Sequence, residues 1–238
     1  MNIAIIPARG GSKRIPRKNI KAFCGQPMIA WSIQAAIESN CFEKIMVSTD
    51  DEEIAEVART FGADVPFFRP PELSDDNAGT IPVIAHAIAW QNANGQQVSN
   101  TCCIYATAPF IQVRDLSRGL SLLQSSGSDY VFSVTSYASP IQRAFRVKPD
   151  QHVEMFQPDQ FNKRSQDLEE AWHDAGQFYW GKASAWLANK NAFGGNSCAL
   201  PLPRYLVQDI DTMEDGVRAE LLFQAFNKKK FYDCVAKY

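Results

Sequence analysis

The sequence IAIIPARGGSKRIPRKNI, residues 3–20, joins an apolar run to a loop rich in glycine and cations. The apolar run, Ile3–Ile6, predicts a strand that is buried on both faces of a sheet. A helical pattern of apolar residues follows at Met28–Ser39, and a second strand-like run follows at Lys44–Ser48. This order of strand, loop, helix and strand predicts a parallel sheet with right-handed crossovers and helices on both faces.

The same alternation continues through most of the chain, with one interruption. Residues 138–174 contain short extended pieces at Arg143–Val147 and His152–Phe156, and then a polar stretch with little core-forming content. We therefore expect a three-layer α/β catalytic domain with a mostly parallel, Rossmann-like sheet, formed by residues 1–137 and 175–238. The inserted segment is then either a surface excursion or an arm that packs on another subunit. The remaining elements are strands at Thr101–Ala106 and Asp129–Val134, helices at Asp51–Phe61, Ile81–Asn92 and Asp115–Ser125, a resumed α/β pattern at Gln177–Trp180 and Ala183–Asn189, and a last helix at Met213–Phe226.

The charge of the chain is unevenly distributed. Its formal net charge of −2 excludes a generally basic nucleic-acid binder, yet six of its 24 Lys and Arg fall within residues 1–21, which contain none of its 26 Asp and Glu. A cationic segment on an otherwise acidic protein indicates a local anion site rather than a track for a long polyanion. No run approaches the ~18–20 apolar residues of a membrane span, and the start of the chain lacks a signal-peptide pattern. We therefore expect a cytoplasmic protein without membrane contacts.

The loop after the first strand has the composition of a polyphosphate site. Gly10 and Gly11 allow the backbone to approach a ligand closely and to direct N–H groups at it. Arg9, Lys13 and Lys18 can then surround the phosphates. A solvated basic surface loop is the alternative, but long loops without secondary structure are usually functional. Ligands of parallel sheets lie beyond the carboxyl ends of the strands, which here are the segments after Ile6, Ser48, Ala106 and Leu206.

Two carboxylates near the last helix have two competing interpretations. Asp209 and Asp211 flank Ile210, so on an extended segment both side chains project to one side. Two carboxylates together with phosphate oxygens are a normal environment for Mg²⁺. However, the segment from Asp211 to Glu214 also resembles a capping box for the last helix. Metal binding and capping both remain open at this point.

Six ordered motifs give the chain a family resemblance. Over essentially its whole length it resembles the CMP-nonulosonic acid synthetase (cytidylyltransferase) family, within the broader nucleotide-diphospho-sugar transferase type of fold. Members of this family transfer CMP from CTP to the anomeric hydroxyl of an acidic keto sugar and release pyrophosphate. The motifs are ARGGSKRIPRKN at 8–19, VSTD at 47–50, RPPELSDDNA at 69–78 with Thr80, TAPF at 107–110, GQFY at 176–179 and DIDT at 209–212.

The resemblance implies a role for each of these motifs. Mg²⁺ is the implied cofactor, with Asp209 and Asp211 as its ligands. Arg9 and Lys13 are the implied catalytic cations, acting together with the two aspartates. The residues implied to bind CTP are Ala8, Arg9, Gly10, Gly11, Ser12, Lys13, Lys18, Asn19, Arg69, Asn77, Ala78 and Thr80, and those implied to bind the sugar are Tyr105, Thr107, Arg164, Gln177 and Tyr179.

The sugar motifs distinguish branches within the family. Tyr105 and Ile111 replace a glutamine and an arginine that are common in the sialic-acid form, and Asp174-Ala175 replaces its Pro-Asn. These forms are most similar to the branch that activates pseudaminic acid, a nine-carbon acidic sugar. N-acylneuraminate or legionaminate is the alternative substrate, and a non-catalytic nucleotide-binding module is the alternative outside enzymes. The family also implies a homodimer, in which residues 138–174 form a dimerisation arm and Arg164 completes the neighbouring sugar pocket.

Overall fold

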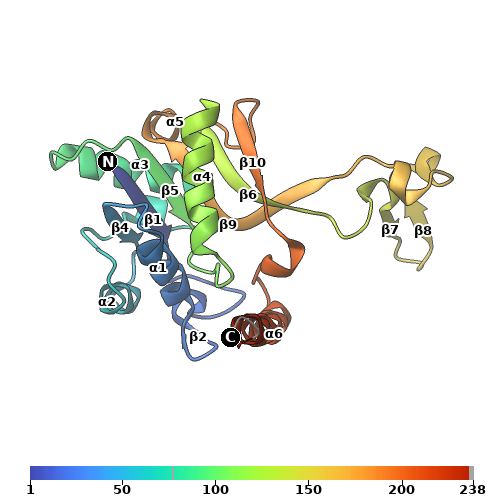
Figure 1. Cartoon of the computed structure of the whole chain (residues 1–238), viewed down its shortest axis with the longest axis horizontal. Helices are drawn as coiled ribbons and strands as arrows, with labels where there is room; N and C mark the ends of the chain where they lie inside the picture. Colours follow the sequence, from blue (N-terminus) through green and yellow to red (C-terminus); the bar gives the residue numbers. More distant parts are fainter. Residues whose placement is uncertain (77, 236–238) are drawn as a thin grey trace.

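A six-stranded mixed sheet forms the centre of the molecule (Figure 1). The computed structural model describes residues 1–76 and 78–235, with side chains up to residue 227. The strands of the sheet are β1 (Asn2–Pro7), β4 (Lys44–Ser48), β5 (Asn100–Ile104), β6 (Tyr130–Ser136), β9 (Trp172–Lys182) and β10 (Ser197–Pro201). Their order is β10-β6-β9-β5-β1-β4. β1 runs parallel to β4 and β5, and β10 runs parallel to β6, whereas β9 is antiparallel to both of its neighbours.

Helices cover both faces of this sheet, which confirms the predicted α/β class. The helices are α1 (Met28–Ser39), α2 (Glu52–Thr60), α3 (Thr80–Ala93), α4 (Val113–Ser126), α5 (Ala183–Leu187) and α6 (Met213–Val235). Alternate residues of β1 point to opposite faces. Ala4 and Ile6 pack in one core cluster with α1, α2 and α4, whereas Ile3 and Ile5 pack in a second cluster with α3 and α5. This double burial is the reason for the unbroken apolar run at the start of the chain.

The antiparallel strand β9 is longer than the predicted Gln177–Trp180. It pairs with β6 over almost its whole length and with β5 on its other side. β6 leads into the inserted segment, and β9 returns from it and pairs with β6 in the opposite direction, so the two strands are the arms of one very long hairpin. The sheet is therefore mixed rather than wholly parallel.

The carboxyl ends of the three parallel strands on one side of the sheet lie along one edge. β1 ends at Pro7 and β4 ends at Ser48, close to the predicted positions. β5 ends at Ile104, so Tyr105 and Ala106 lie beyond the strand rather than in it. The prediction of a strand ending at Leu206 was wrong. The chain leaves strand β10 at Pro201 and, from Pro203 onward, turns into a short 3₁₀ helix that ends at Leu206.

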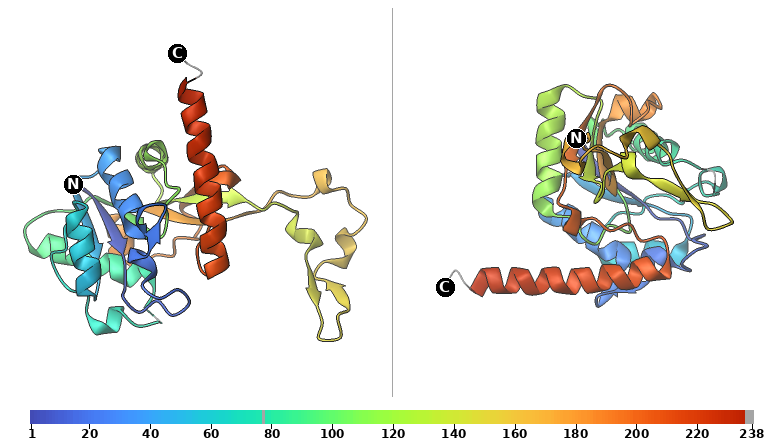
Figure 2. Two further views of the ribbon diagram at one scale, coloured as in Figure 1. Left: turned by 90° about the horizontal axis from the view of Figure 1, so that it is seen from below. Right: turned by 90° about the vertical axis from the view of Figure 1, so that its right-hand side faces the viewer.

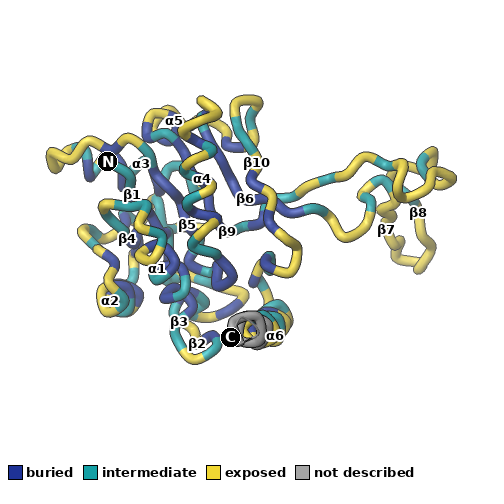
Figure 3. Tube along the Cα trace, in the orientation of Figure 1, coloured by how far each residue is buried: buried dark blue, intermediate teal, exposed yellow. Residues whose placement is uncertain are grey.

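Residues 137–171 leave the sheet between β6 and β9 and extend away from the body (Figures 1 and 2). Their centre is a two-stranded antiparallel sheet of β7 (Phe145–Val147) and β8 (Val153–Met155). Most of this segment is exposed (Figure 3), including several large apolar side chains. These are Ile141, Phe145, Val147, Val153, Phe156 and Phe161.

The last helix, α6, also projects from the body (Figure 2). It extends beyond the predicted end at Phe226, because neither Gly nor Pro interrupts the sequence between 217 and 235. Its first half is held by Phe223, which makes edge-on contacts with Phe23, Trp31 and Phe110. Among the described residues, no helix is both long enough and apolar enough to cross a membrane. The short elements are β2 (Ala22–Phe23), β3 (Gln26–Pro27) and the 3₁₀ helices Lys18–Ile20, Pro71–Leu73, Ile141–Arg143, Pro158–Gln160, Ser165–Asp167 and Arg204–Leu206.

Candidate active site

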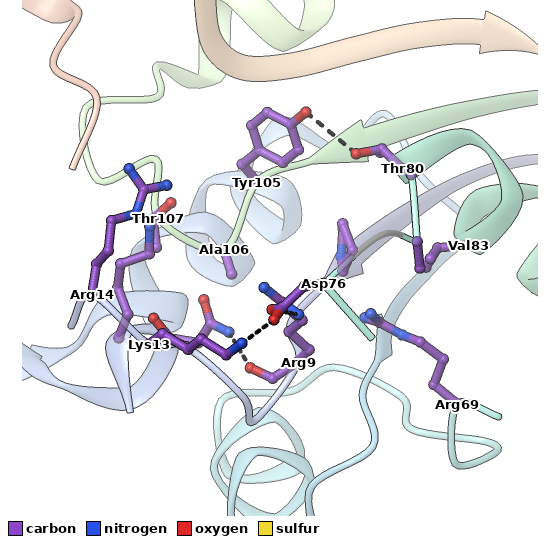
Figure 4. A pocket seen from close by; sticks show the side chains of 16 residues that line it. Arg9, Lys13, Arg14, Arg69, Asp76, Thr80, Val83, Tyr105, Ala106 and Thr107 are labelled. Carbon is purple, nitrogen blue, oxygen red and sulfur yellow. Dashed lines mark hydrogen bonds and ion pairs between the residues drawn. The ribbon is translucent and has the colours of Figure 1, made fainter. Parts of the chain in front are cut away.

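A cavity of about 490 Å³ opens beyond the carboxyl ends of β1 and β5 (Figure 4). This volume lies within the range of about 300–1,000 Å³ that is usual for small-molecule sites. The cavity brings together segments from the first loop, from residues 69–83 and from the chain after β5. The predicted site residues that line it are Arg9, Ser12, Lys13, Lys18, Asn19, Arg69, Ala78, Thr80, Tyr105 and Thr107, and the lining residues that were not predicted are Pro7, Arg14, Asp76, Gly79, Val83 and Ala106.

Hydrogen bonds to β4 and within the loop itself hold the first loop in shape. The amide N–H of Ala8 donates to the carbonyl of Ser48 at 2.9 Å, which continues the β1–β4 pairing. The side chain of Ala8 is buried in the core and does not line the cavity. Asn19 Nδ2 donates to the carbonyl oxygen of Arg9 at 2.9 Å and so ties the two ends of the loop together. Asn19 therefore acts on the loop as well as lining the cavity.

The two glycines of the loop have different surroundings. The N–H of Gly10 donates to Asp50 Oδ1 at 2.9 Å, and a Cβ atom on Gly10 would lie 2.6 Å from Asp51 Oδ2. Only a glycine fits there without displacing Asp51. By contrast, no described heavy atom lies within 4 Å of a Cβ atom built on Gly11. Neither glycine lines the cavity itself.

Arg17 fastens the outer part of the loop to the first turn of α2. Its backbone is left-handed, with φ at 56°, and its guanidinium binds both oxygens of Asp51 and also contacts Glu53. Asp51 is at the same time the N-cap of α2, because its Oδ1 accepts from the N–H of Ile54 at 3.0 Å. The hydrogen bonds from Arg17 lower the pKa of Asp51. Sequence reasoning missed this contact, since nothing in the first loop distinguishes Arg17 from its cationic neighbours.

Arg9 and Lys13 face the cavity and share one carboxylate. Arg9 Nη1 lies 2.7 Å from Asp76 Oδ1, and Lys13 Nζ contacts Asp76 Oδ2 (Figure 4). These contacts lower the pKa of Asp76. Asp76 was not among the predicted site residues. The next residue of the same motif, Asn77, was predicted to bind CTP and lies outside the described residues.

Arg69 is a buried cation at the base of the cavity. Its Nε donates to Ser48 Oγ at 3.1 Å, and its Nη2 donates to the Ser48 carbonyl. Burial lowers the pKa of Arg69 to about 10, so the guanidinium remains charged at neutral pH. A charge held this far from water is retained only where it has a strong partner or a ligand.

One of the two predicted metal ligands, Asp211, is joined to the cavity by two of its cations. Asp211 Oδ2 lies 2.9 Å from Arg14 Nη1, and Asp211 Oδ1 lies 3.2 Å from Lys18 Nζ. Asp209 is two residues away, and partial burial together with the negative charge of Asp211 raises its pKa. The arrangement therefore concentrates negative charge beside a cationic pocket.

The capping box of α6 is shifted by one residue from the predicted Asp211–Glu214. Thr212 Oγ1 accepts from the N–H of Asp215 at 3.2 Å, and Asp215 Oδ2 accepts from the N–H of Thr212 at 2.8 Å. This is a reciprocal capping box with Thr212 as the N-cap. The alternative that Asp211 caps the helix was wrong, because its carboxylate faces Arg14 and Lys18 instead.

Asp209 and Asp211 can hold a Mg²⁺ ion only if bound nucleotide phosphates and water supply its remaining ligands. In the described part of the chain, His, Cys, Asp and Glu side chains form no group of three or more that could hold a metal. Two carboxylates supply part of a hard, oxygen-rich shell, and Mg²⁺ usually takes its remaining ligands from water and substrate phosphates. The mutual repulsion of the two aspartates is also the kind that a cation relieves. The residues present therefore fit the predicted ion.

The predicted sugar-binding residues differ in their positions relative to the cavity. Tyr105 and Thr107 line the cavity, and Tyr105 Oη lies 3.5 Å from Thr80 Oγ1. Tyr179 packs edge-on against Tyr105 and donates to Asp174, one layer behind the cavity. The side chain of Gln177 is buried, and its Nε2 donates to the Leu206 carbonyl, so it does not line the cavity.

Arg164 lies apart from the cavity of its own chain. It is on the extended segment 137–171, its side chain is 73% exposed, and it pairs with Asp167. Any contact of Arg164 with a sugar pocket therefore requires a second copy of the chain. Nothing within one copy brings it there.

A cationic pocket beyond the carboxyl ends of parallel strands, in a three-layer fold, defines a nucleotide-binding α/β protein. The chain belongs to the cytidylyltransferase family, because a family model described as "Cytidylyltransferase" matches residues 3–214. It is 44% identical over 230 residues to a protein named "Pseudaminic acid cytidylyltransferase" from Campylobacter jejuni, and the match covers 97% of this chain and 99% of that protein.

More distant relatives share the same fold. A protein from Escherichia coli named "N-acylneuraminate cytidylyltransferase" is 30% identical over 229 residues, which cover 96% of this chain and 53% of that protein. A solved structure of CMP:2-keto-3-deoxy-manno-octonic acid synthetase, complexed with CTP, superposes with a TM-score of 0.68 at 14% identity. The superposition covers 94% of this chain and 98% of that one. At this identity the likeness concerns the fold alone.

Proposed function

We propose that this protein transfers CMP from CTP to the anomeric hydroxyl of a nine-carbon acidic keto sugar, pseudaminic acid, and releases pyrophosphate. The observation that carries the proposal is the 44% identity, over nearly the full length of both chains, to the pseudaminic acid cytidylyltransferase of Campylobacter jejuni. The cationic cavity supports the same conclusion, since its lining suits a triphosphate. A CTP-dependent enzyme works where the nucleotide is made, so we assign the protein to the cytoplasm.

CTP is held by three parts of the cavity in this proposal. The first loop, from Ala8 to Lys13 together with Lys18, holds the triphosphate, and Asn19 keeps the loop closed through the Arg9 carbonyl. Arg69, Asn77, Ala78 and Thr80 address the cytosine and ribose. The buried charge of Arg69 supports this assignment, because a ligand would compensate for its removal from water.

The reaction is an in-line displacement at the α-phosphorus of CTP. The anomeric oxygen of the sugar forms a bond to this phosphorus, the bond to the β-phosphate oxygen breaks, and the hydroxyl proton leaves to solvent. Such transfers depend on positioning and on neutralisation of charge more than on covalent chemistry. In this proposal Arg9 and Lys13, which both line the cavity, neutralise the departing pyrophosphate.

Mg²⁺ is the proposed cofactor, with Asp209 and Asp211 as its protein ligands. When bound, the ion supplies charge neutralisation at the phosphates and lowers the pKa of an oxygen bound to it. Arg14 and Lys18 already hold Asp211 at the edge of the cavity, so the carboxylate is positioned before the nucleotide arrives. These two cations can therefore hold the partly exposed side chain of Asp211 in a defined position.

The sugar is proposed to bind over Tyr105 and Thr107, with Tyr179 and Gln177 behind them. Its carboxylate needs a cation, and we assign Arg164 from the arm of a second copy. Residues 137–171 carry large apolar side chains without a core of their own, and exposed apolar surface of this kind marks an interface. We therefore propose a homodimer joined through this arm.

One assay tests the proposal. The protein is incubated with CTP, Mg²⁺ and, in separate reactions, pseudaminic acid, N-acetylneuraminic acid, legionaminic acid and Kdo, and pyrophosphate release is measured. We expect the highest kcat/KM with pseudaminic acid. A higher value with N-acetylneuraminic acid would assign the protein to the other branch. Binding of CTP without pyrophosphate release from any sugar would indicate a non-catalytic module.

A further inference from the structure

Asp76 occupies the place that the proposed function gives to pyrophosphate. Its carboxylate lies between the cationic ends of Arg9 and Lys13, and all three side chains line the same cavity (Figure 4). The two cations come from the loop after β1, whereas Asp76 comes from the segment before α3. One carboxylate thus joins opposite walls of the cavity through two ion pairs.

A carboxylate and a phosphate compete for the same donors. Arg and Lys bind either group through charge-assisted hydrogen bonds, and the guanidinium fork of Arg9 suits both. A triphosphate that reaches Arg9 and Lys13 must therefore displace Asp76 from them. Both ion pairs are accessible to water, because the side chains of Arg9, Lys13 and Asp76 are 34%, 80% and 44% exposed. Pairs of this kind are weak and exchange readily.

We propose that Asp76 is an internal counter-ion that determines how tightly the cavity retains pyrophosphate. The proposal rests on the function proposed above. When the β- and γ-phosphates are present they bind Arg9 and Lys13, and Asp76 is displaced. When pyrophosphate leaves, Asp76 pairs with the two cations again. The Asp76 carboxylate therefore weakens the binding of CTP and of pyrophosphate. By competing for Arg9 and Lys13, it also promotes the release of pyrophosphate after the reaction.

If Asp76 competes with phosphates, its substitution should change the affinity for CTP and pyrophosphate but not for CMP. CTP and pyrophosphate both place phosphates on Arg9 and Lys13, so both compete with Asp76. CMP has only the phosphate that stays with the nucleoside, so its binding does not require Asp76 to move. An ordinary supporting residue would instead affect all three ligands in the same direction. Removal of the charge should therefore strengthen the binding of two ligands and leave the third unchanged.

The test is calorimetric titration of the full chain with inorganic pyrophosphate, CTP and CMP, in EDTA so that no metal contributes. Asp76→Asn keeps the shape of the side chain and removes its charge. We expect pyrophosphate and CTP to bind about two- to tenfold more tightly to this variant, in keeping with the weakness of exposed ion pairs, and CMP to bind as before. In an Arg9→Ala background the gain should be smaller, because one of the two competing pairs is already gone.

Glu72→Gln is the matched control. Glu72 is an exposed acid on the same segment, in the short helix Pro71–Leu73, so it reports any general effect of charge near the cavity. We expect this variant to bind all three ligands as the wild type does. Pyrophosphate binding that is unchanged or weaker in Asp76→Asn would overturn the inference. Wild-type protein that binds neither CTP nor pyrophosphate, in EDTA or with Mg²⁺ restored, would instead contradict the proposed function.

Discussion

Lys18 Nζ lies 3.2 Å from Asp211 Oδ1 and 2.8 Å from the carbonyl oxygen of Ile210. This contact joins the first loop to the start of the last helix, across 192 residues of sequence. It also decides between the two interpretations of Asp211. A carboxylate engaged by Lys18 and Arg14 at the edge of a cavity is positioned for a ligand, while the helix start is capped by other residues.

Asp211→Asn should lower kcat sharply and leave the fold intact. The substitution removes a charge that we place beside the reacting phosphates, and loss of one such electrostatic contact reduces kcat by about 100- to 1,000-fold. Stability should change little, because Asp211 does not cap α6. Steady-state kinetics and a thermal melt measure the two effects. A variant with near-normal kcat and a large loss of stability would restore the structural interpretation of Asp211.

Thr212→Ala is the matching control for this prediction. It removes the N-cap oxygen that accepts from Asp215, which costs about 1 kcal/mol. In a chain of this size that corresponds to a fall in Tm of about 2–4 °C. KM and kcat should remain close to the wild-type values at a temperature where both proteins are folded. The two neighbouring substitutions thus separate catalysis from helix capping.

Gly10→Ala should damage the loop, whereas Gly11→Ala should not. A Cβ atom at position 10 would meet Asp51 Oδ2 at 2.6 Å, and relief of such a clash costs about 1–3 kcal/mol. Movement of Asp51 would also disturb Arg17 and raise the KM for CTP. No described atom obstructs a methyl group at position 11. Urea denaturation and CTP kinetics on both variants test the difference, and equal behaviour would contradict it.

The sheet and the cationic loop could be predicted from the sequence because each depends on the types of residues that are close together in the chain. The run Ile3–Ile6 is apolar on both faces, and the double burial of β1 follows from this alone. The direction of β9 does not follow, because an apolar run is the same read either way. The direction of β9 is set by its pairing with β6, the strand on the other side of the inserted arm. This tertiary contact cannot be read from the sequence of residues 172–182.

The misses at the site have a similar cause. Arg17 and Asp76 act through partners 34 and 63 residues away in sequence, and no spacing rule connects them. The segment from Asp211 to Asp215 contains two overlapping capping patterns, one starting at Asp211 and one at Thr212. Local sequence cannot choose between them. The tertiary contacts of Asp211 with Lys18 and Arg14 make the choice, and the cap passes to Thr212.

Asp51 should give the protein a specific loss of stability in acid. Arg17 lowers the pKa of Asp51 in the folded state, below the unfolded value of about 3.9. The stabilisation by this pair is therefore present above pH ~4 and is lost as the pH falls through the folded pKa. Asp51→Asn still caps α2, since Asn and Asp are similar N-caps, but it cannot hold Arg17 as an ion pair. Urea denaturation between pH 3 and 7 should show a gap of about 0.5–1 kcal/mol at neutral pH that shrinks below pH ~4. A gap that does not depend on pH would contradict the role of the charge.

Arg69→Lys should raise the KM for CTP about tenfold and leave kcat nearly unchanged, because it removes binding shared by the ground and transition states. The variant keeps a positive charge but loses the fork that donates to Ser48 through two nitrogens. Its thermal stabilisation by saturating CTP should fall by a corresponding amount. The rise in Tm on adding CTP, compared between the two proteins, measures this directly. An unchanged rise would show that Arg69 serves only to hold the end of β4 at Ser48.

Arg164→Ala should raise the KM for the sugar and leave the KM for CTP unaltered. Arg164 is on the arm 137–171 and does not line the cavity of its own chain, so its effect must arise between two copies. Arg146→Ala is the control, since Arg146 lies on the same arm, in β7, and faces Glu154 and Phe156. Sedimentation of both variants should show the dimer intact, so that a change in KM reflects the lost cation rather than lost assembly.

If the two variants behave alike, or if the wild type sediments as a monomer with full activity, the sugar carboxylate must be bound within one chain. Arg14, the remaining exposed cation of the cavity lining after Lys13, would then be the residue to substitute next.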